Sequence, residues 1–311
     1  MTASASSTAR TRSPAPLRDC QRQLLALVDA IGGTTSDLEL QHLLLLYCLE
    51  PGSGAPYEAV PSPGGPRSFT AGADRQRLIE RGLLAGDAQR WEITPAGRSA
   101  IGQARDLLLS AFARRIAGLR GDALLAETYR RSPYHAIRSE LAARVLGDDP
   151  AALARIAAAR PAAAGPALST IGYEGRSLER YLNDLLGGGV TLLCDVRWNP
   201  ISRKYGFSKA TLADGCTCVG VRYEHLPRLG VPSEQRQHIE TQAQRDALFA
   251  DYERAIGPGQ APLLEQIAGW VRAGERVALT CYELLPEQCH RGRLARMLQQ
   301  RFGAQFAPRH L

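Results

Sequence analysis

The sequence predicts an α/β protein with a mainly parallel sheet in its C-terminal half, preceded by a mostly helical domain. Four short apolar runs after residue 167 alternate with stretches of helical spacing. Strands that alternate with helices favour a parallel sheet with helices on both faces. Before residue 147, apolar residues recur mainly at helical spacing, and a segment rich in Ala and Pro follows.

These patterns divide the 311 residues into four segments. Residues 1–16, rich in Ser, Thr, Ala and Pro, are expected to form a disordered leader. A helical winged-helix-like domain is expected at 17–146, a linker with one short helix at 147–167, and the α/β domain at 168–311.

Charge and cysteine content limit the classes of protein to consider. The net charge of +7 comes almost entirely from arginine, because Lys204 and Lys209 are the only lysines. This excess permits nucleic-acid or phosphate binding, although a biased genome explains it equally well. No apolar run approaches the roughly 20 residues of a membrane span, so no membrane partner is expected. Seven cysteines do not form an even disulfide framework, which predicts a cytoplasmic protein with reduced thiols.

One stretch of the first domain resembles the DNA-contacting part of winged-helix proteins. A helix that begins at Asp74 and ends at Gly82 is followed by a hairpin that leads to Trp91-Glu-Ile-Thr-Pro-Ala-Gly-Arg98. In that class the helix enters the major groove and the wing touches the DNA backbone. The resemblance implies that duplex DNA is a partner, and the alternative is a protein-docking or purely structural role. The DNA-binding candidates are Arg75, Arg77, Arg81 and Arg90.

Each predicted strand of the second domain ends in chemically capable residues. The strands are expected at 168–172, 190–197, 220–226 and 277–281. Because parallel strands bring their carboxyl ends to one edge of a sheet, these residues should converge on one pocket. In chain order they are Tyr173 and Arg176, Asp195 and Arg197, Glu224 and His225, and Cys281 and Glu283.

Four motifs in this half resemble the family known as domain of unknown function 488. They are Thr170-Ile-Gly-Tyr-Glu-Gly-Arg-Ser-Leu, Cys194-Asp-Val-Arg-Trp-Asn-Pro-Ile-Ser202, His225-Leu-Pro-Arg-Leu-Gly-Val-Pro-Ser-Glu234, and Cys281-Tyr-Glu with Cys289-His-Arg291. The resemblance runs from about residue 168 to 302. It implies a compact α/β domain with a polar pocket but no settled activity. The sequence departs from many members at Tyr173-Glu174.

Roles for the candidate residues follow from their chemistry. Asp195, Glu283 and Glu224 are candidate acids or bases, because a carboxyl group in a partly dry pocket can have a raised pKa. Cys281 is a candidate nucleophile, since Arg291 and a helix N-terminus can lower the pKa of a thiol. Alternatively, the Asp–Arg pair fixes the pocket loops and the glutamates cap loops. The candidates for binding a small anionic ligand or phosphate are Arg197, His290, Arg291, Tyr173, Arg176, Ser202 and His225.

No cofactor is expected, with zinc as the weaker alternative. Cys281, Cys289 and His290 can supply three ligands and Cys194 a fourth, although adjacent ligands such as Cys-His are awkward. Cys216 and Cys218 are expected in a Gly-flanked turn without a role. The loop at 199–209 mixes basic and aromatic residues, as loops that contact single strands do, and as ordinary exposed loops also do.

Three functions are compatible with the sequence. The first is an enzyme of hydrolase or transferase type that acts on nucleic acid or a nucleotide delivered by the first domain. The second is a non-catalytic DNA-binding regulator whose α/β domain senses a small anionic ligand. The third is a thiol- or metal-dependent enzyme unrelated to nucleic acid.

Overall fold

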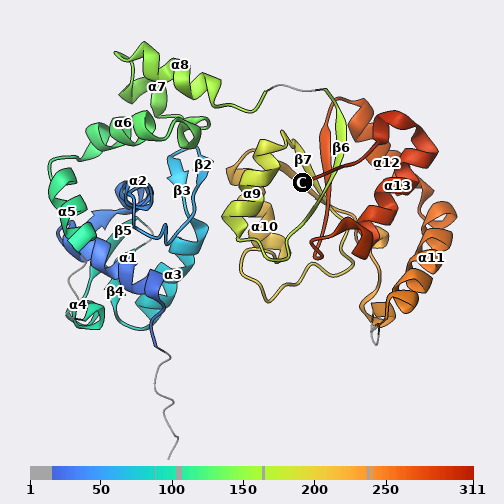
Figure 1. The fold of residues 1–311 in the computed structure, drawn as a ribbon, viewed down its shortest axis with the longest axis horizontal. Coiled ribbons are helices and arrows are strands. Elements are labelled where there is room, and N and C mark those ends of the chain that lie inside the picture. Colours follow the sequence, from blue (N-terminus) through green and yellow to red (C-terminus); the bar gives the residue numbers. More distant parts are fainter. Residues whose placement is uncertain (1–15, 88, 103–106, 163–164, 237–238, 240) are drawn as a thin grey trace, which may run out of the picture.

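The computed structural model describes residues 16–87, 89–102, 107–162, 165–236, 239 and 241–311. It has an N-terminal part, residues 16–162, and a C-terminal part, residues 165–311, which lie side by side in Figure 1. Residues 1–15 of the predicted leader lie outside the described residues. No helix in the described part of the chain has both the length and the apolar character that crossing a membrane requires.

The C-terminal part is built on a five-stranded sheet with the order β10-β6-β9-β7-β8, in which all paired neighbours are parallel. The strands are β6 Ala167–Gly172, β7 Leu192–Asp195, β8 Arg222–His225, β9 Arg276–Cys281 and β10 Arg309–His310. The predicted parallel sheet with its first four strands is therefore confirmed. The edge strand β10 was not predicted, because two residues give no periodicity to recognise.

Helices cover both faces of this sheet (Figure 1). The helices are α9 Leu178–Gly187, α10 Lys209–Cys218, α11 Gln242–Gly259, α12 Ala261–Arg272 and α13 His290–Phe302. The first two pack on one face through residues such as Leu182 and Leu212, and the last three pack on the other through residues such as Ile256, Leu264 and Leu294. The turn predicted around Cys216 and Cys218 is wrong, because both cysteines lie on α10.

The alternation of side chains along β9 assigns its residues to opposite faces. Val277 and Leu279 pack with α11–α13, whereas Ala278 packs with α9 and α10. Because successive strand residues point to opposite sides, Cys281 belongs to the α11–α13 face. Thr280 points the other way and accepts a hydrogen bond from the Tyr181 hydroxyl of α9 at 2.7 Å.

The N-terminal part is mostly helical, with short strands. Its elements are α1 Asp19–Ala30, β1 Thr34–Ser36, α2 Asp37–Cys48, β2 Val60–Ser62, β3 Gly65–Arg67, α3 Phe69–Glu80, β4 Leu84–Ala85, β5 Arg90–Ile93, α4 Pro95–Ile101, α5 Leu107–Ile116, α6 Gly121–Arg131, the 3-10 helix η1 Pro133–Ala136, α7 Ala142–Val145 and α8 Pro150–Ala158. A three-stranded sheet has the order β1-β5-β4 and buries Trp91 completely. The short helix expected in the linker corresponds to α8, which packs against the α6 region through Ile156.

The segment at 51–66, rich in Pro and Gly, leads into the β2–β3 hairpin, which docks on the C-terminal part. Val60 at the start of this hairpin is fully buried in the cluster formed with α9 and α10. Beside it, the Asn183 side chain of α9 donates to the Ala59 carbonyl at 2.9 Å and accepts from the Tyr134 hydroxyl at 2.8 Å. Because Pro and Gly are typical of loops, these three-residue strands could not be recognised in the sequence.

A buried carboxylate of α9 joins the two parts at the start of α3. Glu179, which is 1% exposed, accepts from the Thr70 backbone N–H at 2.7 Å, the Thr70 hydroxyl at 2.9 Å and the Ser68 hydroxyl at 3.2 Å. A carboxylate at a helix N-terminus satisfies N–H groups that have no partner within the helix and also complements the helix dipole. The C-terminal part therefore caps α3.

We expect Glu179→Ala to destabilise the full chain by about 2 kcal/mol, because it leaves three polar groups at a buried contact without their acceptor. The measurement is urea unfolding followed by circular dichroism. Glu179→Gln keeps the shape and one acceptor oxygen, so its free energy of unfolding should lie between those of the wild type and Glu179→Ala. Equal midpoints for Glu179→Ala and the wild type would contradict the cap.

Candidate functional site

The predicted site residues do not form a single pocket. Asp195 follows Leu193 by two positions on β7 and so shares the α9–α10 face, whereas Cys281 lies on the α11–α13 face. The sheet edge therefore carries two clusters that lie back to back. Glu283, expected to face Asp195 and Arg197, instead belongs with the cysteines.

The first cluster is a buried ion pair enclosed by aromatic rings. Arg197 donates from Nε to Asp195 Oδ1 at 2.8 Å and from Nη2 to Oδ2 at 2.5 Å. Its Nη1 donates to the Tyr173 hydroxyl at 3.0 Å and to the Phe207 carbonyl at 2.7 Å. The Tyr223 hydroxyl donates to the same Asp195 carboxylate at 2.6 Å.

These hydrogen bonds engage the Arg197 guanidinium with groups of the protein itself. Arg197 is 4% exposed, and the Tyr173 ring stacks on Phe207 with centroids 4.3 Å apart. A guanidinium whose donors already meet a carboxylate, a hydroxyl and a carbonyl has little left to offer a phosphate. The geometry is the one expected if the Asp195–Arg197 pair fixes the loops at the sheet edge.

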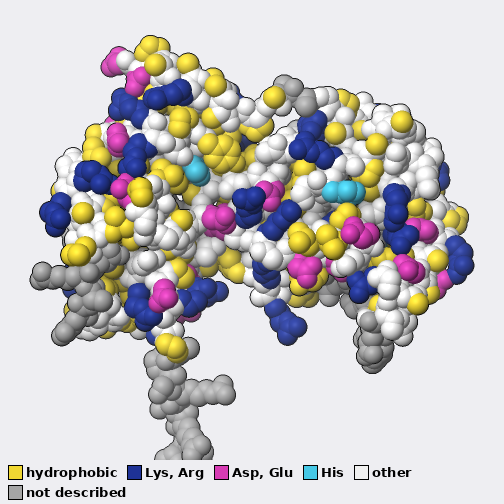
Figure 2. All heavy atoms as spheres, viewed as in Figure 1, with side chains coloured by type: hydrophobic (Ala, Val, Ile, Leu, Met, Phe, Trp, Pro, Cys, Tyr) yellow, Lys and Arg dark blue, Asp and Glu magenta, His cyan; other side chains and the backbone are white. Residues whose placement is uncertain are grey.

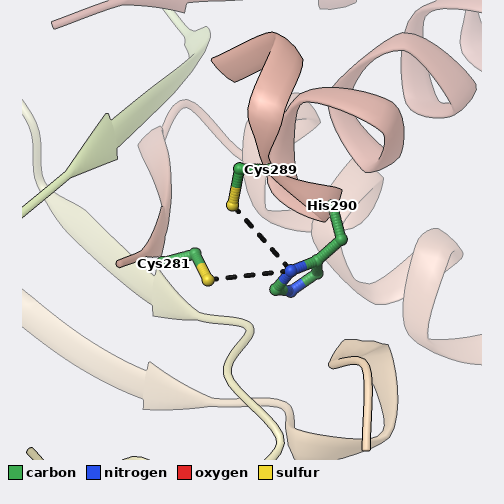
Figure 3. Close-up of side chains that lie close together, drawn as sticks. All are labelled: Cys281, Cys289 and His290. Carbon is green, nitrogen blue, oxygen red and sulfur yellow. Dashed lines mark hydrogen bonds between the residues drawn. The ribbon is translucent and has the colours of Figure 1, made fainter. Parts of the chain in front are cut away.

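The second cluster brings together Cys281, Cys289 and His290, all buried (Figure 3). His290 Nδ1 faces both sulfur atoms, at 3.6 Å from Cys281 Sγ and 3.9 Å from Cys289 Sγ. The other ring nitrogen, Nε2, lies 3.0 Å from the Val196 carbonyl oxygen. Because a carbonyl only accepts, Nε2 carries a proton and is fixed in place.

Local backbone geometry explains how neighbouring residues point at one place. Cys281 is the last residue of β9. Cys289 is the N-cap of α13 in an extended conformation, with φ −132° and ψ 142°, and His290 is the first helical residue. The change from extended to helical backbone between Cys289 and His290 lets both side chains converge on Cys281. Cys289 and His290 can therefore serve as ligands of one ion although they are adjacent in the sequence.

The turn between β9 and α13 is held by a buried arginine and two close approaches. Arg291, 1% exposed, donates from its two terminal nitrogens to the Glu283 and Leu284 carbonyls. A Cβ on Gly172 would lie 1.9 Å from the Glu283 carbonyl oxygen, and one on Gly292 would lie 2.1 Å from the Pro286 carbonyl oxygen. Arg291 was expected to bind an anion, but its hydrogen bonds to these two carbonyls stabilise the turn instead.

The close packing of these groups shifts their protonation. Burial alone would raise the pKa of the Cys289 thiol, but the contacts with Cys281 and His290 hold it well below its ordinary value. The hydrogen bond to Cys289 and burial raise the pKa of Cys281. Burial opposes the charged form of His290, yet the Cys289 thiolate raises the imidazole pKa. The cluster therefore favours a Cys289 thiolate beside an imidazolium.

Glu283 lies between this cluster and an open cavity of about 170 Å³. Burial and the neighbouring Cys289 raise the pKa of its carboxyl group to about 7. Its Oε2 atom is buried and has no hydrogen-bond partner among the described residues. The cavity is lined by Val231, Ile239, Arg245, Leu248, Phe249, Glu283, Gln288 and His290.

Helix α11 forms one wall of the cavity, which was not predicted from the sequence. Arg245 and Phe249 are four positions apart on this helix, so they lie on one face and both reach the cavity. The spacing was visible in the sequence, but nothing in it indicated that this face turns toward the end of β9. Gly172 and Gly292 were missed for the same reason, because a close approach is a property of the fold.

The remaining candidates have other contacts. Glu224 is 43% exposed and pairs with Arg222 at 3.7 Å, and His225 Nε2 lies 2.9 Å from the Arg197 carbonyl oxygen. Arg176 donates to the Leu311 carbonyl at 2.9 Å. Ser202 accepts at its hydroxyl from the Lys204 backbone N–H at 3.1 Å. Cys194 lies in the apolar core, outside the group of thiols and imidazole described above.

The DNA-binding candidates line α3 and the hairpin that follows it. Arg77 pairs with Asp74 at 3.0 Å, and Arg75 donates to the Arg90 carbonyl at 3.0 Å. Arg81 and Arg90 are exposed, with Arg90 donating to the Thr34 hydroxyl at 3.1 Å. Figure 2 shows Lys and Arg side chains scattered over both parts on this face, without one dominant patch.

The fold and site define an α/β unit with a parallel sheet and a buried thiol–imidazole–carboxyl site at the carboxyl end of its strands. Residues 177–298, most of the C-terminal part of the chain, match the family described as Domain of unknown function DUF488. The resemblance expected from the four motifs is thus confirmed. Comparison with curated proteins gives no match, and comparison with solved structures gives none either.

We expect Asp195→Asn to cost about 3–5 kcal/mol of unfolding free energy, because it leaves Arg197 as a buried charge without its partner. Urea unfolding of the full chain measures the loss. Glu224→Gln is the matched control, since its exposed ion pair contributes less than about 1 kcal/mol. A stable Asp195→Asn variant would contradict the structural role of the pair.

Proposed function

We propose that this chain is an enzyme whose reaction centre is the Cys281–Cys289–His290 cluster together with Glu283. In this proposal the cavity beside α11 receives the reacting part of the substrate. Glu283 is the group that accepts or delivers a proton there, because its free Oε2 lies next to the cluster. The reaction is of the hydrolase or transferase type.

One observation carries the proposal: four titratable side chains gather at one place beside a cavity. Two thiols and an imidazole are buried, with exposures of 1% for Cys281, 1% for Cys289 and 3% for His290. Burying such groups costs stability unless they serve each other or a ligand. Titratable groups that perturb each other in a cleft are common at active sites.

The size and lining of the cavity narrow what can enter. An apolar cavity of about 150 Å³ holds a benzene ring, so about 170 Å³ suffices for one small ring or a similar group. Apolar walls from Val231, Leu248 and Phe249 suit the faces of such a group, whereas Arg245 and Gln288 can meet its polar edge.

We further propose that the substrate is a nucleotide or a nucleic acid that the N-terminal part delivers. Its support is the order α1-β1-α2-α3-β4-β5, with the β2–β3 hairpin inserted between α2 and α3, and the strand order β1-β5-β4. Exposed Arg81 at the end of α3, exposed Arg90 on β5 and the net charge of +7 add to it. Since Glu179 caps the first turn of α3, DNA would have to meet the far end of α3 and the hairpin, where Arg81 and Arg90 lie.

The reaction centre is tested with a mixture of nucleotides, short oligonucleotides and small-molecule cell extract, analysed by mass spectrometry before and after incubation. We expect the wild type to convert at least one component, and Glu283→Gln to lose at least about 100-fold of that rate, as expected for loss of a general acid or base.

Glu224→Gln is the control, because it removes an exposed carboxyl group of the same sheet edge. Turnover that survives in Glu283→Gln, or that disappears equally in both variants, would place the reaction elsewhere. No conversion by the wild type of any component in the mixture would count against an enzyme of this substrate range.

Delivery of nucleic acid is tested separately by fluorescence anisotropy with a labelled duplex. Affinity should fall steeply with salt, and Arg81→Glu with Arg90→Glu should weaken binding and reduce the salt slope by about one per lost phosphate contact. Arg254→Glu on α11, which changes the charge by two units as each of these two substitutions does, should leave binding unchanged. Salt-independent or absent binding removes the nucleic-acid role.

A further inference from the structure

We propose that Cys281, Cys289 and His290 hold a zinc ion, with a fourth coordination position open toward the cavity beside α11. The inference deepens the proposed function and rests on it for the location of the reaction centre. It adds the cofactor, which the proposed function leaves undefined.

The distances between the three ligand atoms suit tetrahedral zinc. With Zn–S near 2.3 Å and Zn–N near 2.0–2.1 Å, a tetrahedral angle separates sulfur from nitrogen by roughly 3.5 Å. The two sulfur atoms lie 3.6 and 3.9 Å from His290 Nδ1, and all three ligand atoms lie within 4.8 Å of one another. Zinc therefore fits with only small movements of the side chains.

The contacts of the imidazole are those of a metal ligand. A histidine that binds a metal through one ring nitrogen usually donates the other N–H to a carbonyl or carboxylate, which fixes the ring. His290 Nε2 is held in this way by the Val196 carbonyl at 3.0 Å. Its Nδ1 faces the two sulfur atoms, as Figure 3 shows.

The charges of the three ligands suit a buried dication. Zinc binds cysteine as a thiolate and histidine as a neutral imidazole, so Cys281, Cys289 and His290 form a neutral unit with Zn²⁺.

Three protein ligands leave one position of the tetrahedron for water or substrate, the arrangement of catalytic zinc sites. His290 and Glu283 both line the cavity, so this position faces the space that a substrate would enter. Cys194 was the expected fourth ligand, but its place in the apolar core keeps it away from the other three ligand atoms. Zinc-bound water next to Glu283 provides a nucleophile and a proton acceptor side by side.

The test is zinc binding by the full-length chain, purified under reducing conditions and stripped of metal. Titration with Zn²⁺ against a chromophoric chelator should give one tightly bound ion per chain. Replacement by Co²⁺ should give visible bands of a tetrahedral site with sulfur-to-metal charge transfer. No binding, a spectrum without sulfur ligands, or a Cys281–Cys289 disulfide formed in place of metal binding would overturn the proposal.

Variants assign the site to its residues. Cys289→Ser and Cys281→Ser should each lower zinc affinity by more than the roughly 10–100-fold that loss of an outer partner alone costs. Cys194→Ala, another buried cysteine of the same sheet, is the matched control and should bind as the wild type does. Wild-type affinity in both serine variants would overturn the assignment, and circular dichroism identifies any variant that fails to fold.

Glu283→Gln separates this inference from the proposed function. It should keep zinc, because Glu283 is not one of the three ligands, and lose turnover. Zinc retained with full turnover would leave the metal site standing and refute the role of Glu283. Turnover by wild-type protein that binds no zinc would refute the metal site and leave the proposed reaction centre standing.

Discussion

The turn that brings Cys281, Cys289 and His290 together depends on one buried side chain, Arg291. Its guanidinium joins the first turn of α13 to the Glu283 and Leu284 carbonyls just beyond β9. That connection, together with the tight contact at Gly292, folds the intervening residues back so that Cys281 and Cys289 meet His290. An arginine that appears suited to an external anion therefore organises the turn, and the cysteines and histidine are left for chemistry.

At its carboxyl edge, the parallel sheet carries a structural ion pair on one face and the thiol–imidazole cluster on the other. On the α9–α10 face, Asp195 and Arg197 neutralise each other among aromatic rings and anchor the loops. On the α11–α13 face, His290 and Glu283 border a cavity, and the buried Glu283 Oε2 has no hydrogen-bond partner among the described residues. The same edge thus supplies a rigid frame on one side and a site on the other.

Much of the fold could be predicted from the sequence, because apolar runs and helical spacing are local signals. Four of the five strands of the parallel sheet follow from them. The division of the site does not, since it depends on which face of a strand each residue occupies where the strand ends. Asp195 and Cys281 looked like neighbours because both end a strand. Zinc was the weaker alternative because adjacent ligands such as Cys289 and His290 are awkward, and the backbone change at Cys289 that brings both to Cys281 is not visible in the sequence.

We infer that Cys281, Cys289 and His290 together form one site that holds a metal ion. Anomalous diffraction from crystals of the full chain grown with zinc, recorded on both sides of the zinc edge, tests it most directly. We expect a single strong peak about 2.0–2.3 Å from His290 Nδ1 and both sulfur atoms, facing the cavity. Zinc bound only elsewhere in the crystal, or a disulfide joining the two cysteines in that position, would contradict it.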